Sequence, residues 1–305
     1  MSARPTLWLL DSHYQIFRAY HAMPDLRAPD GTPTGAVRGY ASQLVKLLVR
    51  ERPTHVAAAW DLELTSFRNE IHPGYKAGRT EPPPDLAPQF ALCDEVTRAL
   101  GVPVIGLERF EADDVIATMT AHALDDGADV VIASSDKDLA ALVSDRVSLF
   151  DPRAEALLGP AGIEARLGVP PDLVPDFLTL VGDAVDDIPG VPGIGAKTAA
   201  ALLRRFGRIE DIPADPREWA GLELRGAARA ARALAEGQAA IALARQLVRM
   251  REDLPIRERV ADLRWDGADR GALTALCERL GISSLLDRVP RFRDQVTRGG
   301  CAERR

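Results

Sequence analysis

The segment TLWLLD at residues 6–11 is a short apolar run that ends in a carboxylate. Two later segments repeat the pattern, HVAAAWD at 55–61 and DVVIASSD at 129–136. Short apolar runs bounded by turn-forming residues are typical of buried strands. We therefore expect three strands, each followed by an aspartate: Asp11, Asp61 and Asp136.

Helical patterns separate these runs along the first half of the chain. Two further strands are expected at VPVIGL (102–107) and RVSLFD (146–151). Strand and helix alternate at a spacing that predicts a parallel sheet. The fold class expected for residues 1–160 is therefore α/β, with a central, mostly parallel sheet and helices on both faces. The expected helices are AVRGYASQLVKLLVR (36–50), LAPQFALCDEVTRALG (86–101) and EADDVIATMTAHALDDG (111–127).

The strand-like runs stop after residue 160, and residues 161–290 are expected to form a helical region. Its longest pattern, RGAARAARALAEGQAAIALARQLVRM at 225–250, is helical throughout. The polar tail at 291–305 is expected to be disordered. Between two elements of the first half, residues 62–85 are irregular and include a proline run. Because the stretch is too long for a routine connection, we expect a functional loop over the sheet edge.

The composition excludes several classes of protein. Of 305 residues, 46% are apolar and 27% are charged, which is ordinary for a soluble globular protein. The chain has no run of about 18 apolar residues, and its start reads as a strand rather than a secretory signal. Cys93, Cys277 and Cys301 are scattered, which argues against a disulfide framework and a zinc site. A reducing compartment is expected, most simply the bacterial cytoplasm.

Carboxylates are expected to converge at one edge of the sheet. The carboxyl ends of parallel strands share an edge, where ligands bind. Taken singly, each acid could be a helix cap or a solvated turn residue. As a set they would repel one another and raise one another's pKa values unless cations neutralised them. The nine acids are Asp11, Asp61, Glu111, Asp113, Asp114, Asp136, Asp138, Asp183 and Asp186.

Oxygen ligands of this kind favour Mg²⁺ or Mn²⁺ over zinc. Two such ions about 4 Å apart would match two-metal phosphodiester hydrolysis. The net charge of −7 argues against a nucleic-acid partner, but without the nine acids the charge becomes +2. If the acids hold cations, the negative net charge is only a weak argument against a nucleic-acid partner.

A glycine corner follows the last acids, in GVPGIGAKTAAALL at 190–203. It fits neither the P-loop nor the GxGxxG pattern. Glycines that lead into a helix N-terminus let backbone N–H groups approach a phosphate, and a lysine adds charge. A plain packing corner between two helices is the alternative. The residues expected to contact DNA here are Gly193, Ile194, Gly195, Lys197 and Thr198.

Five blocks of the sequence, in this order, resemble the 5′-nuclease (flap endonuclease) family. Within that family the similarity is to the 5′→3′ exonuclease domain of bacterial DNA polymerase I and its free-standing relatives. It extends from about residue 6 to 290. The blocks are LLDSHYQIFRAYHAMP (9–24), AAAWDLELTSFRNEIHPGYKAGR (57–79), FEADDVIA (110–117), SSDKDLAALVSD (134–145) and TLVGDAVDDIPGVPGIGAKTAAALLRRFG (179–207).

The resemblance implies hydrolysis of phosphodiester bonds near 5′ ends of flap, nicked or branched DNA, in replication or repair. RNA primers paired with DNA would also be substrates, and a separate polymerase could be a functional partner. The resemblance also implies a monomer without a membrane, and a helix-hairpin-helix element at about 188–206 that could hold K⁺. One metal site would use Asp11, Asp61, Glu111 and Asp113. The second would use Asp136, Asp138 and Asp183, assisted by Asp114 and Asp186.

The same resemblance makes residues 62–90 a gateway, or arch, for a single strand. Lys76 and Arg79 would contact the scissile phosphate as catalytic residues, and Tyr75 could stack on a base. Arg68 is a weaker candidate for contact with the DNA backbone. His13 is expected to pack or hydrogen-bond rather than to catalyse.

Two other functions remain open at this point. A non-catalytic protein that binds DNA junctions could share the fold, and a metal-dependent ribonuclease could share the acids. The complete acidic set favours an enzyme over the first. The glycine corner and the length of the gateway favour DNA over the second.

Overall fold

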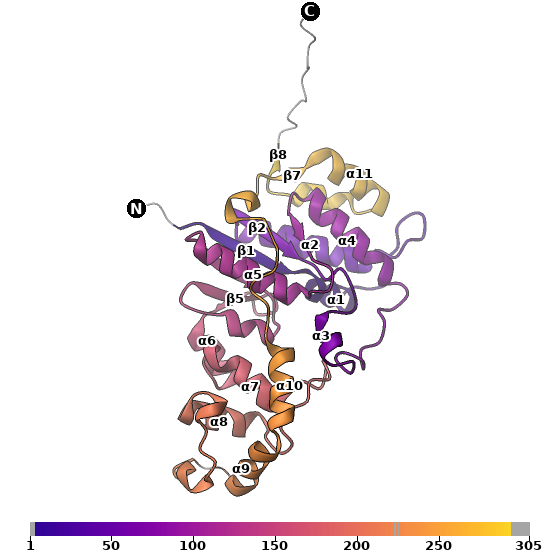
Figure 1. Ribbon diagram of the computed structural model, residues 1–305. Coiled ribbons are helices and arrows are strands. Elements are labelled where there is room, and N and C mark those ends of the chain that lie inside the picture. Colours follow the sequence, from indigo (N-terminus) through magenta and orange to yellow (C-terminus); the bar gives the residue numbers. More distant parts are fainter. Residues whose placement is uncertain (1–3, 223, 225, 294–305) are drawn as a thin grey trace, which may run out of the picture.

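A central sheet organises the fold, as expected. The computed structural model describes residues 4–222, 224 and 226–293. Within them, six strands lie in the order β3-β2-β1-β4-β5-β6 (Figure 1). All neighbouring strands are parallel except β5 and β6. The strands are β1 (Thr6–Asp11), β2 (His55–Ala59), β3 (Val104–Ile105), β4 (Asp129–Ala133), β5 (Val147–Asp151) and β6 (Ala156–Leu158).

Strand β1 lies at the centre of the sheet, where the order of the strands reverses. The chain moves outward from β1 to β2 and β3, then returns to β4 on the other side of β1. In the register of the sheet, Leu10 pairs with Ala58 of β2 and Ala133 of β4. The carboxyl ends of these three strands therefore meet at the reversal, which is the position where open α/β sheets bind ligands.

Helices cover both faces of the sheet. The α-helices are α1 (Ser12–Ala22), α2 (Gly35–Arg50), α3 (Phe67–Ile71), α4 (Ala87–Ala99), α5 (Ala112–Asp125), α6 (Pro160–Leu167), α7 (Val174–Val181), α8 (Ala196–Phe206), α9 (Ala227–Glu236), α10 (Gln238–Val248) and α11 (Arg270–Leu280). The short 3₁₀ helices are η1 (Asp138–Leu142), η2 (Pro171–Leu173), η3 (Ile209–Asp211), η4 (Pro216–Trp219), η5 (Val260–Leu263) and η6 (Ser283–Arg288).

Alternate side chains of β1 divide the core in two. Trp8 and Leu10 join a cluster with residues of α1, α2, α4 and α11. Leu7 and Leu9 join a second cluster with α5, α7, α8 and α10. Figure 1 shows the second group extending below the sheet through α7, α8 and α9. The two groups of helices thus lie on opposite faces, with the strand ends between them.

The helical pattern at 225–250 forms two helices, α9 and α10, which meet at Gly237. A Cβ at Gly237 would lie 2.7 Å from the carbonyl oxygen of Ala233, so the close turn requires glycine. Near the end of the expected helical region, the buried hydrophobic residues between 265 and 285 belong to the core cluster that contains Trp8 and Leu10. Helix α11 packs on α4, and Trp265 donates to the carbonyl oxygen of Leu100 at 2.8 Å.

The tail expected to be disordered, residues 291–305, includes two residues that form a strand. Residues Phe292–Arg293 form β8, which pairs in parallel with β7 (Ala268–Asp269). In β8, the ring of Phe292 lies under the guanidinium of Arg270, whose Cζ atom is 3.8 Å from the ring centroid. Residues 294–305 lie outside the described part of the chain.

A pair of glycines joins the last acids to the glycine corner. A Cβ at Gly190 would lie 2.2 Å from the carbonyl oxygen of Val181, and one at Gly182 would lie 2.4 Å from the nitrogen of Gly190. Between them, Asp183 and Ile188 exchange two backbone hydrogen bonds of 3.0 and 2.8 Å. This backbone contact, which no larger residue permits, holds residues 182–190 as a closed loop.

None of the helices in the described residues is both long enough and apolar enough to span a membrane.

Candidate metal centre

Three carboxylates lie at the ends of the three central strands. Asp11 is the last residue of β1, Asp61 follows β2, and Asp136 follows β4. Asp11 accepts a hydrogen bond of 2.7 Å from the Ser134 hydroxyl and caps α1 through the Tyr14 amide. Asp61 accepts from the Ala112 amide at the start of α5 at 2.6 Å. Asp11 is a helix cap and Asp61 binds the first amide of α5, so contact with a helix N-terminus and membership of the rim are not alternatives.

Mutual repulsion acts on the acids around Asp11. Burial, together with the charges of Asp136 and Asp61, raises the pKa of Asp11 to about 7. Burial and the charges of Asp136 and Asp11 raise the pKa of Asp113 well above its ordinary value. Groups that disfavour one another's charge in this way lie close together, and they would be relieved by a cation. This clustering of carboxylates around Asp11 fits the first metal site that the resemblance implies.

A second group consists of Asp138, Asp183 and Asp186, whose carboxylate oxygens lie within 4.8 Å of one another. Burial and the charge of Asp136 raise the pKa of Asp138 to about 7. The Oδ1 atom of Asp138 is buried without a hydrogen-bond partner among the described residues. A buried oxygen left unpaired beside other carboxylates suits a hard divalent cation. The donor set therefore fits a metal at this position.

Basic side chains from the gateway and from η1 pair with the same acids. The ammonium of Lys76 lies 3.0 Å from Glu111 and 3.9 Å from Asp186. Burial raises the pKa of Glu111, but the charges of Lys76 and Arg68 outweigh it and lower that pKa overall. Arg79 forms an ion pair with Asp186, and Lys137 lies 2.7 Å from Asp183. These cations offset part of the negative charge of the centre.

The gateway segment lies directly against the acids. It contains helix α3, from Phe67 to Ile71, and ends in the first residues of α4. Beyond it, the amide of Lys76 donates to the carbonyl oxygen of Asp186 at 3.0 Å, and Gly78 donates to Asp187 at 2.8 Å. Lys76 has a φ of 55°, a left-handed conformation that is uncommon outside glycine. Contacts with the acidic loop hold the segment in this shape.

Arg68 does not lie where DNA could contact it, which corrects the expectation from sequence. Its side chain is buried and forms a bidentate pair with Asp114 at 2.7 and 2.8 Å. Its remaining donors bind the carbonyl oxygens of Leu247 and Arg249 at the end of α10. Asp114 also accepts from the Arg251 amide at 2.9 Å. Because the oxygens of Asp114 are already occupied, this acid holds Arg68 and α10 rather than a metal.

Tyr75 is also too buried to stack on a base, which corrects a second expectation from the sequence. Its side chain is 3% exposed, and its hydroxyl donates to Glu111 at 3.0 Å. The Ser66 hydroxyl donates to the other oxygen of Glu111 at 2.8 Å. Tyr75 and Ser66 therefore fix the orientation of Glu111. Arg68 and Tyr75 lie in an irregular, proline-containing segment, and nothing in the sequence of that segment indicates that they have buried partners.

The glycine corner presents backbone and charge to solvent at the start of α8. Gly193 has a φ of 89°, which favours glycine, and Gly195 immediately precedes the helix. Lys197 is exposed and Thr198 is partly exposed. Ile194 differs, because its side chain is buried in the core and its amide donates to Val191 at 3.0 Å. It anchors the corner and does not present a donor to a ligand.

Three residues near the acids were not assigned a site role from sequence. Ser134 donates to Asp11, and Lys137 pairs with Asp183. His13 stacks on Phe90 with ring centroids 4.9 Å apart and accepts from the Asp61 amide, as a packing residue would. Burial lowers the pKa of His13. The only sequence signal for Ser134 and Lys137 was their place within SSDKD, among the acids themselves.

Stability without metal is expected to fall as pH rises. In that state Asp11 and Asp138 have pKa values of about 7 in the fold and about 4 when unfolded. Between these values the folded chain holds more protons than the unfolded chain, so stability decreases with rising pH. Thermal melts in EDTA at pH 5 and pH 7.5 measure this, and Mg²⁺ should restore more stability at pH 7.5. A melting temperature in EDTA that rises across the range would contradict the prediction.

Comparison with known proteins accounts for this arrangement. Residues 6–168 match the family described as "5'-3' exonuclease, N-terminal resolvase-like domain". Residues 169–271 match "5'-3' exonuclease, C-terminal SAM fold". The chain belongs to the 5′-3′ exonuclease family. The two matches also place the boundary between the sheet and the lower helices of this 5′-3′ exonuclease near α6 and η2.

Relatives of the chain include much longer enzymes. The chain is 43% identical over 258 residues to DNA polymerase I of Rhizobium leguminosarum, covering 82% of this chain and 25% of the polymerase. It is 37% identical over 288 residues to DNA polymerase I of Bacillus caldotenax, covering 93% and 32%. The chain thus spans a quarter to a third of the length of these relatives.

The fold is shared with a solved flap endonuclease of bacteriophage T5, determined as a complex with DNA and metal ions. The TM-score is 0.64 at 23% identity, with coverage of 80% of this chain and 88% of that chain. The mostly parallel sheet followed by a helical domain is therefore the fold of this family, as the sequence predicted.

Proposed function

We propose that this 5′-3′ exonuclease is a structure-specific 5′-nuclease that hydrolyses phosphodiester bonds at or near the 5′ ends of flap, nicked or branched DNA. The observation that carries the proposal is the convergence of acids from β1, β2, α5, β4 and the 182–190 loop on one rim. The complete set favours hydrolysis over DNA binding alone. The DNA and metal ions bound by the T5 flap endonuclease, which has the same fold, support the substrate and the cofactor.

The acids and their basic partners have distinct roles in this proposal. When bound, a pair of Mg²⁺ or Mn²⁺ ions would lower the pKa of the attacking water and stabilise the leaving oxygen. Asp11, Asp61, Asp113 and Glu111 would hold one ion, and Asp136, Asp138, Asp183 and Asp186 the other. Asp114 would act indirectly by orienting Arg68 and the start of α5.

Lys76 and Arg79 would turn to the scissile phosphate when metal replaces them as partners of the acids. In this structure they pair with Glu111 and Asp186. A phosphate that enters between the gateway and the rim would offer them a new anion. Both side chains would then orient the phosphate and stabilise the charge that develops on it.

Further parts of the proposal concern partners. Gly193, Gly195, Lys197 and Thr198 would hold the duplex, with K⁺ at nearby carbonyl oxygens. RNA primers in hybrid duplexes would be accepted, the protein would act as a monomer in the bacterial cytoplasm, and it would work beside a polymerase.

Cleavage of a labelled 5′-flap tests the proposal. We expect products with 5′-phosphates in Mg²⁺ or Mn²⁺ and none in EDTA. A matched RNA flap and a blunt duplex test the preference for DNA and for structure. Absence of cleavage with both metals, from protein that binds the flap, would refute the nuclease and favour a junction-binding protein.

Lys76→Ala is expected to slow chemistry more than binding, because the ammonium lies among the acids rather than on the outer surface. We expect the single-turnover rate to fall about a hundredfold, with the Kd for flap DNA changed less than about threefold. Lys197→Ala is the contrasting variant, since it should weaken binding and leave the rate at saturation nearly unchanged. If Lys76→Ala instead gave the pattern expected of Lys197→Ala, Lys76 would not contact the scissile phosphate.

A further inference from the structure

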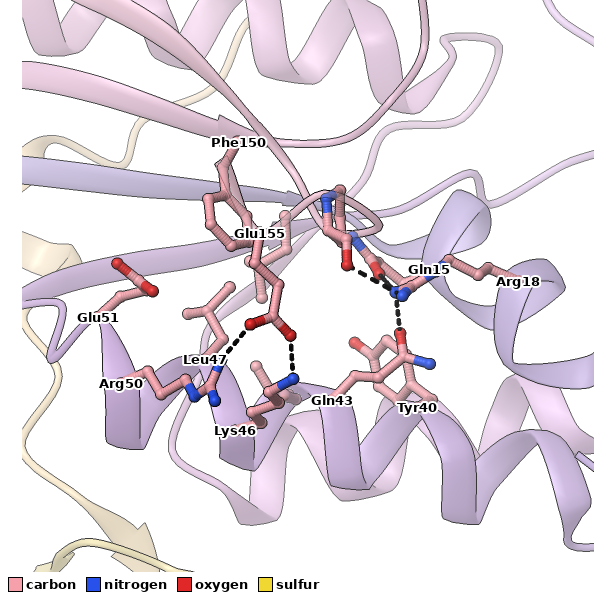
Figure 2. Close-up of a pocket in the computed structure, with 13 residues that line it drawn as sticks. Gln15, Arg18, Tyr40, Gln43, Lys46, Leu47, Arg50, Glu51, Phe150 and Glu155 are labelled. Carbon is pink, nitrogen blue, oxygen red and sulfur yellow. Dashed lines mark hydrogen bonds and ion pairs between the residues drawn. The ribbon is translucent and has the colours of Figure 1, made fainter. Parts of the chain in front are cut away.

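A small pocket lies beside the acidic rim, between α1, α2 and the hairpin formed by β5 and β6 (Figure 2). Its volume is about 80 Å³, and its floor is apolar, with Leu44, Leu47 and Phe150. Two lining residues place the pocket near the carboxyl ends of β1 and β4. Leu10, which also lines it, precedes the rim residue Asp11, and Gln15 donates to the carbonyl oxygen of Ala133 at the end of β4.

Three cations border the pocket: Arg18, Lys46 and Arg50. Arg18 donates to Gln43 at 2.8 Å and to the carbonyl oxygen of Pro152 at 3.0 Å. Within the described residues, no carboxylate lies within ion-pair distance of Arg18. Its charge is therefore held by neutral oxygens on the surface of an otherwise acidic protein.

One carboxylate bridges the other two cations. Glu155, in the turn of the hairpin, pairs with the Lys46 ammonium and the Arg50 guanidinium. Figure 2 shows its side chain reaching down from the hairpin to both cations. Glu155 has a φ of 51°, in the left-handed region that residues other than glycine rarely adopt. The turn is thus held in an uncommon conformation while its carboxylate lies between the two bases.

We propose that Lys46 and Arg50 form a binding site for a backbone phosphate of DNA, and that Glu155 occupies this site until the DNA displaces it. The inference rests on the proposed function for its ligand. A carboxylate and a phosphate present similar paired oxygens to lysine and arginine, and arginine binds phosphate in a bidentate manner. The hairpin is attached through the edge strand β6, whose three residues let the turn move without breaking the parallel sheet.

The site formed by Lys46 and Arg50 would contact a different part of the DNA from the glycine corner. Helix α2 lies on the face of the sheet that carries Trp8 and Leu10, and α8 belongs to the opposite face. The acidic rim lies between the two faces. In this proposal the phosphate on Lys46 and Arg50 belongs to DNA on the far side of the scissile bond from the duplex that Gly193 and Lys197 would hold.

Equilibrium binding in EDTA tests the site separately from cleavage. We expect Glu155→Gln to bind a nicked duplex about fivefold more tightly than the parent, because DNA no longer displaces two surface ion pairs. Glu51→Gln is the matched control: it removes the same charge from the same pocket, and Glu51 has no ion pair among the described residues. Its effect should remain below about twofold.

Lys46→Gln with Arg50→Gln supplies the second arm of the experiment. This double variant should bind the nicked duplex more weakly, with a slope of log Kd against log salt reduced by about 1 to 2. In its background, Glu155→Gln should have no further effect. A duplex that ends at the scissile position lacks DNA on the far side of the bond, so Glu155→Gln should not tighten its binding.

Two results would overturn the inference. One is an effect of Glu155→Gln no larger than that of Glu51→Gln. The other is equal tightening by Glu155→Gln with and without Lys46 and Arg50. A structural role alone would lower the melting temperature of Glu155→Gln without tightening DNA binding, so thermal melts accompany each variant. Failure of the parent to cleave flaps would refute the proposed nuclease but would leave these binding comparisons intact.

Discussion

The double substitution Asp136→Ala with Asp138→Ala is expected to abolish cleavage of flap DNA, with a loss of at least about a thousandfold in rate. Both acids lie in the centre of the rim. The charge of Asp136 raises the pKa values of Asp11, Asp113 and Asp138, which shows how closely it approaches each of them. Their removal takes two of the four ligands from the proposed second metal site. Single-turnover cleavage in Mg²⁺ measures the loss.

Binding should respond in the opposite direction. Two negative charges are removed from the surface that faces the phosphates, so the variant should bind flap DNA in EDTA at least as tightly as the parent. Its melting temperature in EDTA should not fall, because acids that repel one another have been removed. The double variant Asp125→Ala with Asp145→Ala makes the same charge change at exposed positions and should cleave normally. Substantial cleavage by the Asp136 and Asp138 variant would refute the metal centre described here.

Arg68→Ala is expected to cause the largest loss of stability among single substitutions in the gateway. Asp114 is 0% exposed, and the substitution would leave it as an unpaired buried charge. Breaking a buried pair in this way costs about 3–5 kcal/mol. For a chain of this length the melting temperature should fall by about 5–8 °C. Thermal denaturation followed by circular dichroism measures the change.

Two comparisons separate this role from contact with DNA. Arg109→Ala removes an exposed partner of Glu70 from the neighbouring loop and should cost less than about 1 kcal/mol. Arg68→Ala combined with Asp114→Ala should be more stable than Arg68→Ala alone, because no buried charge then remains unpaired. If Arg68→Ala had normal stability and weakened DNA binding, Arg68 would contact the DNA backbone, as the sequence suggested.

The sheet and its acidic rim could be predicted because they follow from short-range patterns. Apolar runs that end in Asp11, Asp61 and Asp136 predict strands, and the parallel topology brings their ends together whatever the rest of the chain does. The helix N-terminus at Glu111 to Asp114 was predictable for the same reason. These features depend on local periodicity and on one general rule of sheet geometry.

The errors concern side chains whose partners are distant in sequence. Arg68 binds the carbonyl oxygen of Leu247, and Tyr75 binds Glu111; nothing near either residue indicates burial. A polar, proline-containing segment has the composition of a solvated loop, yet Arg68 and Tyr75 within it are buried because acids from elsewhere in the chain bind them. The return of α11 to α4 was missed for a related reason: a helical pattern does not reveal which neighbour covers its apolar face.

The backbone contact between Gly182 and Gly190 sets a distance that the enzyme cannot easily alter. Asp183 lies in this closed loop, and the turn at Gly193 follows three residues after its end. In the proposed function, the phosphate held at the turn and the bond that is cut would therefore keep a constant separation, counted in nucleotides. We expect this loop to act as a ruler for the cut. Its length, rather than the reading of any base, would then decide how far from the junction the strand is severed.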